Sequence, residues 1–259
     1  MKRGIYILPS VFTVANIAAG FSSIQYSISP IPNFTAAAWA IFVAILMDIT
    51  DGRVARAMHA ESSFGMELDS LADFLSFGVA PSILMYQILL KDMGKVGFAI
   101  ALFFIAASAL RLARFNAIAQ QNKEVTNHFE GLPTTAAGGI IASFVLSYEL
   151  FAEGGELTVK TIPMLMKRMP IFFKTMPFLM VIISFFLISK IKYSNFKKMN
   201  LDRPHSFQLL GMLVVAIILI LMYPQNTIFL IYILYFLSGL IGYLFRAFRL
   251  RKRGEQKVS

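Results

Sequence analysis

Four aspartates in one short stretch are the residues of this sequence best suited to chemistry. They lie in "DITDGRVARAMHAESSFGMELDSLAD", as Asp48, Asp51, Asp69 and Asp73. Residues three or four apart share one face of an α-helix, so each successive pair would present two carboxylates together. A short turn between the two helices would then bring all four carboxylates to one pocket.

The residues around these carboxylates favour a divalent metal and a phosphate ligand. Neighbouring carboxylates repel one another unless protons or cations compensate their charge. Oxygen ligands suit Mg²⁺, Mn²⁺ or Ca²⁺, and the absence of cysteine excludes thiolate ligands, disulfides and a cysteine nucleophile. Arg56 offers a fork of donors matched to phosphate, while Gly52 and Gly65 let the backbone approach a bulky ligand. The combination suggests a substrate that contains pyrophosphate.

The elements that must position these residues are membrane helices. Hydrophobic residues make up 57% of the chain, charged residues 15%, and the mean hydropathy is +0.68, which is typical of an integral membrane protein. Apolar windows of about 18 to 25 residues, the length that crosses a bilayer, predict eight spans. We therefore expect an all-α, polytopic helical bundle that forms one membrane domain over residues 1–259. The predicted spans are 5–27, 33–51, 69–90, 96–119, 134–152, 171–189, 207–223 and 226–244.

The basic residues predict the orientation of this bundle. An even number of spans places both termini on one side, and most of the 24 Lys and Arg residues fall on that side. Both termini and the Asp-rich stretch are therefore expected to face the cytoplasm, with the protein in the cell membrane. The net charge of +10 lies in short loops beside the spans, which favours anionic lipid headgroups over nucleic acid as the partner.

The Asp-rich stretch resembles the signature of the CDP-alcohol phosphotransferase family, which reads DxxDGxxAR and then GxxxDxxxD. The matching residues are Asp48, Asp51, Gly52, Ala55, Arg56, Gly65, Asp69 and Asp73. By this resemblance, the first three aspartates hold two divalent cations, Mg²⁺ or Mn²⁺, while Asp73 helps to hold the second and is the candidate general base. The resemblance also places Gly52, Ala55, Arg56 and Gly65 at the CDP-lipid site.

Three further stretches are similar to those of membrane-type phosphatidylserine synthases. They are "LPSVFTVANIAAGF", "LRLARFN" and "EGLPTTAAG". The resemblance implies transfer of the phosphatidyl group of CDP-diacylglycerol to L-serine, giving phosphatidylserine and CMP, by an enzyme that is commonly a homodimer. The last three predicted spans, 171–244, receive no functional assignment.

Polar residues in these stretches are candidates for substrate binding. Asn16, inside the first predicted span, either contacts the CDP-lipid or hydrogen-bonds a neighbouring helix. Arg111 and Arg114 lie three apart on one helix face and are suited to the carboxylate of serine. Asn116 or Glu130 offers an oxygen to the serine ammonium, with backbone N–H groups of the following helix nearby.

Alternatives remain open at this point. A sister phosphotransferase would use glycerol 3-phosphate, inositol phosphate or another alcohol, and an archaeal counterpart would use ether lipids; the signature does not separate these. A cation transporter also places carboxylates among spans, although its site is expected near the membrane midplane. A Mg²⁺-dependent prenyltransferase would need paired DDxxD-like motifs, and no DD pair occurs in the chain.

Overall fold

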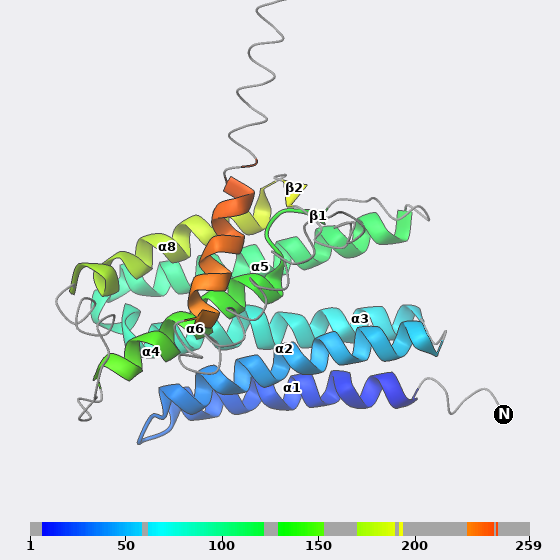
Figure 1. Cartoon of the computed structure of the whole chain (residues 1–259), viewed down its shortest axis with the longest axis horizontal. Helices are drawn as coiled ribbons and strands as arrows, with labels where there is room; N and C mark the ends of the chain where they lie inside the picture. Colours follow the sequence, from blue (N-terminus) through cyan, green and yellow to red (C-terminus); the bar gives the residue numbers. More distant parts are fainter. Residues whose placement is uncertain are drawn as a thin grey trace, which may run out of the picture.

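The computed structural model of the chain is almost entirely helical (Figure 1). It describes residues 7–58, 62–121, 129–152, 170–189, 192–193, 227–240 and 242. The predicted span 207–223 lies outside these residues.

The described elements follow the predicted order of helices. The segment Thr227–Leu240 is called the last described helix below. Strands β1 and β2 pair in antiparallel fashion over two residues each, a small exception to the predicted all-α fold. The elements are α1 (Ile7–Ile28), α2 (Phe34–Ala57), α3 (Ser63–Asp73), the π-helix η1 (Phe74–Val79), α4 (Ala80–Ile88), the 3₁₀-helix η2 (Leu90–Met93), α5 (Lys95–Gln121), β1 (Phe129–Glu130), α6 (Thr134–Ala152), α8 (Pro170–Ile188) and β2 (Lys192–Tyr193).

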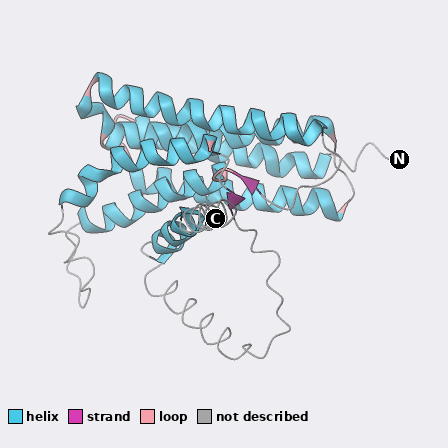
Figure 2. Ribbon diagram, turned by 90° about the horizontal axis from the view of Figure 1, so that it is seen from above, coloured by secondary structure: helices cyan, strands magenta, loops and turns pink. Residues whose placement is uncertain are grey.

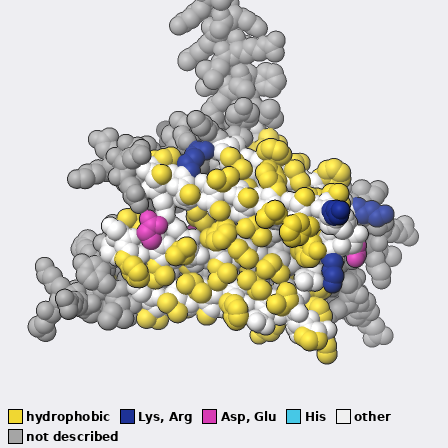
Figure 3. Space-filling view, turned by 180° about the vertical axis from the view of Figure 1, so that it is seen from behind, with side chains coloured by type: hydrophobic (Ala, Val, Ile, Leu, Met, Phe, Trp, Pro, Cys, Tyr) yellow, Lys and Arg dark blue, Asp and Glu magenta, His cyan; other side chains and the backbone are white. Residues whose placement is uncertain are grey.

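Several of these helices are apolar enough to lie in a membrane. Three are also long enough to cross it: Phe34–Ala57, Ser63–Ile88, which combines α3, η1 and α4, and Lys95–Ile118. Shorter apolar helices are Thr134–Ser147, Lys174–Ile188 and Thr227–Leu240. Figure 3 shows a broad hydrophobic face with its charged side chains toward the margins. The chain is therefore a membrane protein with several apolar helices, while the count of eight spans stays a prediction.

The turn inside the Asp-rich stretch is shorter than expected. Helix α2 continues to Ala57, beyond the predicted end at residue 51, and α3 already begins at Ser63. The Ser62 hydroxyl caps α3 by accepting from the Gly65 N–H at 3.0 Å, which satisfies one of the unpaired donors of the first turn. Most of the Asp-rich stretch is consequently helical, and its side-chain directions are set by helix geometry.

Helix α1 holds the two carboxylate-bearing helices. It packs along α2 and also contacts α3, η1 and α4. The contact with η1 is close, because a Cβ at Gly20 would lie only 2.9 Å from the Ser76 Cα. Glycine at such a crossing lets two backbones approach each other as in other membrane helix pairs. The two helices that bear the aspartates therefore share one support.

A π-helix interrupts the long helix Ser63–Ile88 directly after Asp73. It spans Phe74–Val79, and the Ser76 hydroxyl inside it donates to the Asn16 carbonyl of α1 at 3.0 Å. Phe77 is fully buried in the core that α2, α4, α5 and α6 share. Short π-helical segments often occur at functional sites because they rotate the side chains that precede them relative to those that follow.

Candidate active site

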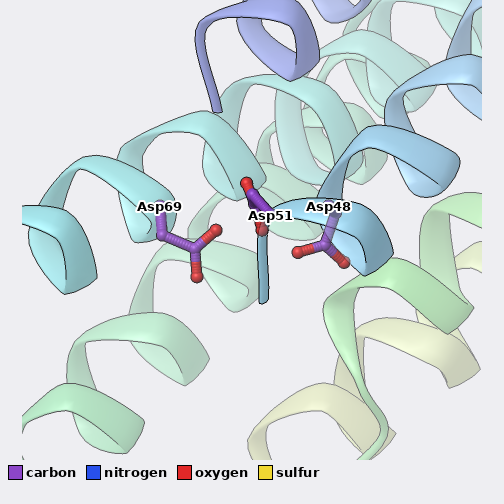
Figure 4. A group of neighbouring side chains, drawn as sticks. All are labelled: Asp48, Asp51 and Asp69. Atoms are coloured by element: carbon purple, nitrogen blue, oxygen red, sulfur yellow. The ribbon is translucent and has the colours of Figure 1, made fainter. Parts of the chain in front are cut away.

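Three of the four predicted metal ligands meet in the structure. Asp48 and Asp51 come from the last turns of α2, and Asp69 comes from the middle of α3 (Figure 4). Each offers a carboxylate oxygen, and the three oxygens lie within 4.8 Å of one another. Asp51 is buried, with 5% of its surface exposed, whereas Asp48 and Asp69 are half-buried. One side of the group therefore stays accessible to a ligand.

The oxygens of this group are not fully satisfied by the protein. Asp51 Oδ2 and Asp69 Oδ1 are buried without a hydrogen-bond partner among the described residues. The Thr13 hydroxyl of α1 hydrogen-bonds the Asp51 carboxylate, so its second oxygen remains for another ligand. Buried polar atoms normally have partners, and clustered carboxylates need compensating charge. An oxygen-only donor set with two orphaned oxygens fits a divalent cation such as Mg²⁺ or Mn²⁺.

Asp73 lies near this group and also near the half-buried Arg111. It is the last residue of α3, one turn after Asp69. Its Oδ1 accepts a long hydrogen bond of 3.5 Å from Asn16 Nδ2. It also interacts electrostatically with the three other carboxylates and, with opposite sign, with Arg111. Asp73 thus lies near Asp48, Asp51 and Asp69, but its carboxylate is not part of the group whose oxygens lie within 4.8 Å of one another.

The residues predicted for the CDP-lipid lie around the end of α2 and the start of α3. The exposed Arg56 side chain folds back over Gly52, since a Cβ at Gly52 would lie 3.5 Å from Arg56 Nη1. Ala55 is partly exposed on the same turn. The Gly65 N–H is already used by the Ser62 cap, so it is not a donor for phosphate. Asn16 is fully buried, and its Oδ1 has no described partner.

The predicted serine-binding arginines have different surroundings. Arg111 Nη1 donates to the Thr134 hydroxyl at 2.6 Å, while its Nε is buried without a described partner. Arg114 Nη1 instead donates to the Ile188 carbonyl at the end of α8, at 3.0 Å. The structure therefore places Arg111 toward Asp73 and ties Arg114 to α8.

Asn116 and Glu130 are not brought to Arg111 by any described contact. Asn116 Nδ2 donates to Ser70 Oγ at 2.9 Å and to Glu67 Oε2 at 3.2 Å, so its amide joins α5 to α3. Glu130 stands on β1 opposite Lys192, and its side chain lies outside what the structure describes.

A glycine turn leads from β1 to the α6 residue that holds Arg111. Gly131 has a φ of +83°, which favours glycine, and a Cβ there would lie 2.7 Å from the Leu187 carbonyl oxygen. The next residue, Leu132, donates its N–H to the Phe186 carbonyl at 3.1 Å. The turn is thereby fastened to the end of α8, and Thr134 at the start of α6 is positioned for Arg111.

Sequence reasoning missed three residues of the site. Thr13 bonds Asp51, Ser76 bonds the backbone of Asn16, and Thr134 receives Arg111. Thr13 carries a usable signal, because it stands three residues before Asn16 on the same helix face of an otherwise apolar segment. Ser76 and Thr134 become recognisable only once the helices are packed.

Known proteins resemble this chain over most of its length. Residues 6–169 match the family described as CDP-alcohol phosphatidyltransferase. A Helicobacter pylori (strain ATCC 700392 / 26695) protein named "CDP-diacylglycerol--serine O-phosphatidyltransferase" is 32% identical over 244 residues, covering 93% of this chain and 92% of the relative. A Bacillus subtilis (strain 168) protein of the same name is 31% identical over 191 residues, covering 74% and 92%. An archaetidylserine synthase of Methanothermobacter thermautotrophicus is 35% identical over 142 residues, covering 54% and 58%.

Proposed function

Because the chain belongs to the CDP-alcohol phosphatidyltransferase family, we propose that it transfers the phosphatidyl group of CDP-diacylglycerol to L-serine. The products would be phosphatidylserine and CMP. The observation that carries this proposal is the group of three carboxylates, two of them with an orphaned oxygen, near Asp73 and the half-buried Arg111. Relatives of about 32% identity whose names include serine support the choice of acceptor.

The carboxylates would organise the pyrophosphate of the donor. Asp48, Asp51 and Asp69, whose oxygens lie close enough to share a metal ion, would hold two Mg²⁺ or Mn²⁺ ions with help from Asp73. When bound, the ions would supply positive charge to the phosphate oxygens and to the departing CMP. Arg56 at the accessible end of α2 would contact the donor phosphates, with Gly52 and Ala55 leaving room beside it.

Asp73 would serve as the general base for the acceptor. The serine hydroxyl oxygen would form a bond to the lipid-side phosphorus while the bond from that phosphorus to the CMP oxygen breaks. Asp73 would take the hydroxyl proton, and Asn16 Nδ2 would keep its carboxylate oriented. A carboxylate is a weak base for an alkanol, so positioning and electrostatic stabilisation would supply most of the acceleration.

Arg111 would bind the serine carboxylate. One of its N–H groups is held by Thr134, and its buried Nε–H lacks a described partner. A charged donor that is fixed on one side and available on the other suits a small anionic group. Glu130 and Asn116 remain proposals for the ammonium.

We also propose that the site faces the cytoplasm and that eight spans place both termini there. The tip of α1 and α2 at Ser29 and the turn at Ser62 lie at opposite ends of the long helices. In the naturally cysteine-free chain, Ser29→Cys should react with an impermeant reagent outside intact cells, and Ser62→Cys should not. Labelling of Ser62→Cys from outside would reverse the orientation.

The function is tested by an acceptor panel with the purified full chain. CMP release from CDP-diacylglycerol is measured with L-serine, glycerol 3-phosphate, inositol phosphate and no acceptor, each with Mg²⁺ or Mn²⁺. We expect CMP release with L-serine and not in the other three conditions. Turnover with glycerol 3-phosphate but not serine would move the chain to a sister activity of the same family. A parallel assay with an ether-lipid donor tests whether the chain shares the activity in the name of its archaeal relative, archaetidylserine synthase.

A further inference from the structure

The last described helix lies outside residues 6–169, the part that matches the family, yet it packs against α2, α6 and α8 within or beside that part. It crosses the longer helices steeply in Figure 1, and Figure 2 views it nearly end-on. Aromatic side chains attach it to three earlier helices. The ring pairs are Tyr232 with Phe42 of α2 at 6.1 Å, Phe229 with Phe144 of α6 at 6.1 Å, and Phe236 with Phe186 of α8 at 5.0 Å.

The contact with α6 leaves little freedom for this helix. A Cβ at Gly139 would lie 2.4 Å from the Tyr232 ring, so the ring rests directly on the α6 backbone. Glycine leaves room for this contact, as at other tight helix crossings in membranes. Tyr232 therefore fixes the position of this helix against α6. The side chains one turn later are oriented by the same contact, because helix geometry relates them to Tyr232.

Tyr235 is the residue that this anchor directs toward the site. It stands three residues after Tyr232 and is partly buried against the core. It interacts electrostatically with the Arg111 guanidinium, which also interacts with Asp73. A phenol oxygen is a good acceptor for a guanidinium N–H. Arg111 is thus held by Thr134 of α6 and lies near Tyr235 of the last described helix.

A second line of contacts joins the same helix to Arg111. Phe236 packs on Phe186, whose carbonyl receives the Leu132 N–H. Leu132 leads into Thr134, which holds Arg111 Nη1. The position of the last described helix is therefore transmitted to Arg111 through packing and hydrogen bonds as well as through Tyr235.

We propose that Tyr235 is a positioning residue for Arg111, and that the last described helix forms one wall of the acceptor-alcohol site. The inference rests on the proposed function, in which Arg111 binds the acceptor carboxylate. It assigns to a segment beyond the family match a part in choosing the acceptor, while the carboxylates of α2 and α3 handle the donor.

The test compares Tyr235→Phe with Tyr232→Phe in the purified full chain. Both variants lose one phenol oxygen from the same helix and keep the ring. Tyr235→Phe should raise the KM for serine by about 3- to 10-fold, the size of one hydrogen bond, and leave the KM for CDP-diacylglycerol unchanged. Tyr232→Phe should leave both KM values nearly unchanged, because its ring makes the packing contact.

A double-mutant cycle shows whether Tyr235 acts through Arg111. In an Arg111→Lys background, Tyr235→Phe should have almost no further effect on the KM for serine. Equal changes in both KM values, equal effects of the two Tyr variants, or full additivity with Arg111→Lys would overturn the inference. If the wild type uses another alcohol instead of serine, the proposed function fails, and the same KM comparison with that alcohol still decides the role of Tyr235.

Discussion

The two halves of the candidate site are built in different ways. The carboxylate half comes from α2 and α3, which are neighbours in the chain, and its oxygens include two that no described group satisfies. The arginine half comes from α5, and each arginine there is held by a distant element. Thr134 of α6 holds Arg111, and the Ile188 carbonyl of α8 holds Arg114.

This difference separates a half whose clustered charge needs a ligand from a half whose charged groups the fold already orients. Clustered carboxylates with orphaned oxygens are electrostatically unfavourable until a cation binds them. A guanidinium with fixed protein partners is already oriented, and it needs a ligand only at its remaining donors. We therefore expect the carboxylate half to respond to metal and to charge removal, and the arginine half to respond to changes in packing and geometry.

Removal of divalent ions should have the largest effect, and it should act on the carboxylate half alone. A chelator should abolish CMP release, and Mg²⁺ or Mn²⁺ should restore it. Added Mg²⁺ should also raise the melting temperature of the wild type, because a ligand that binds only the folded state stabilises it. Asp51→Asn should lose most of that rise, whereas Arg111→Lys should keep it. Full activity in chelator would show that the reaction needs no divalent ion at these carboxylates.

Asp69→Asn should lower kcat on the order of 10²-fold or more, as is typical when a preorganised electrostatic group is removed. The change keeps the side-chain shape and removes one charge from the group of three. Asp92→Asn is the matched control, because Asp92 is exposed in η2 and belongs to neither half. The measurement is CMP release at saturating substrates. Near-normal turnover in Asp69→Asn would contradict the assignment of this carboxylate.

Arg111→Lys should raise the KM for serine about tenfold, the lower end of the effect of a hydrogen bond to a charged group. Lysine keeps the charge but lacks the fork that can hold Thr134 and a ligand together. Arg114→Ala should raise the KM for serine less, because one of its donors already binds the Ile188 carbonyl. Lys95→Ala, an exposed cation in the first turn of α5, is the control. A KM change for CDP-diacylglycerol alone would reassign Arg111 to the donor.

Two glycine substitutions should show the smallest effects on catalysis and the clearest contrast in stability. Gly131→Ala should destabilise the protein by about 1–3 kcal/mol, because its φ is positive and the added Cβ meets the Leu187 carbonyl. Gly52→Ala adds only an ordinary contact with Arg56, so its melting temperature should stay near that of the wild type. Its KM for CDP-diacylglycerol should rise instead. Equal melting temperatures for both variants would contradict the contrast.

Much of the helical fold could be predicted from hydrophobic runs. The predicted bounds 134–152 coincide with α6, and 171–189 differs from α8 by one residue at each end. The start of α3 was misplaced, because the polar residues before Asp69 were read as a turn although the Ser62 cap starts a helix there. The π-helix Phe74–Val79 and the pairing of β1 with β2 had no predicted counterpart, since both depend on contacts with distant segments.

The spacing of the aspartates by itself determined that Asp48 and Asp51 share one helix face, as do Asp69 and Asp73, because helix geometry is local. The composition likewise determined a membrane protein, because burial of apolar surface depends on residue type. Only the tertiary structure decided that Arg111 stands beside Asp73 and Thr134 while Arg114 turns to α8. The two arginines lie three residues apart with the same chemistry, so their different partners follow from the packing of α6, α8 and the last described helix around α5.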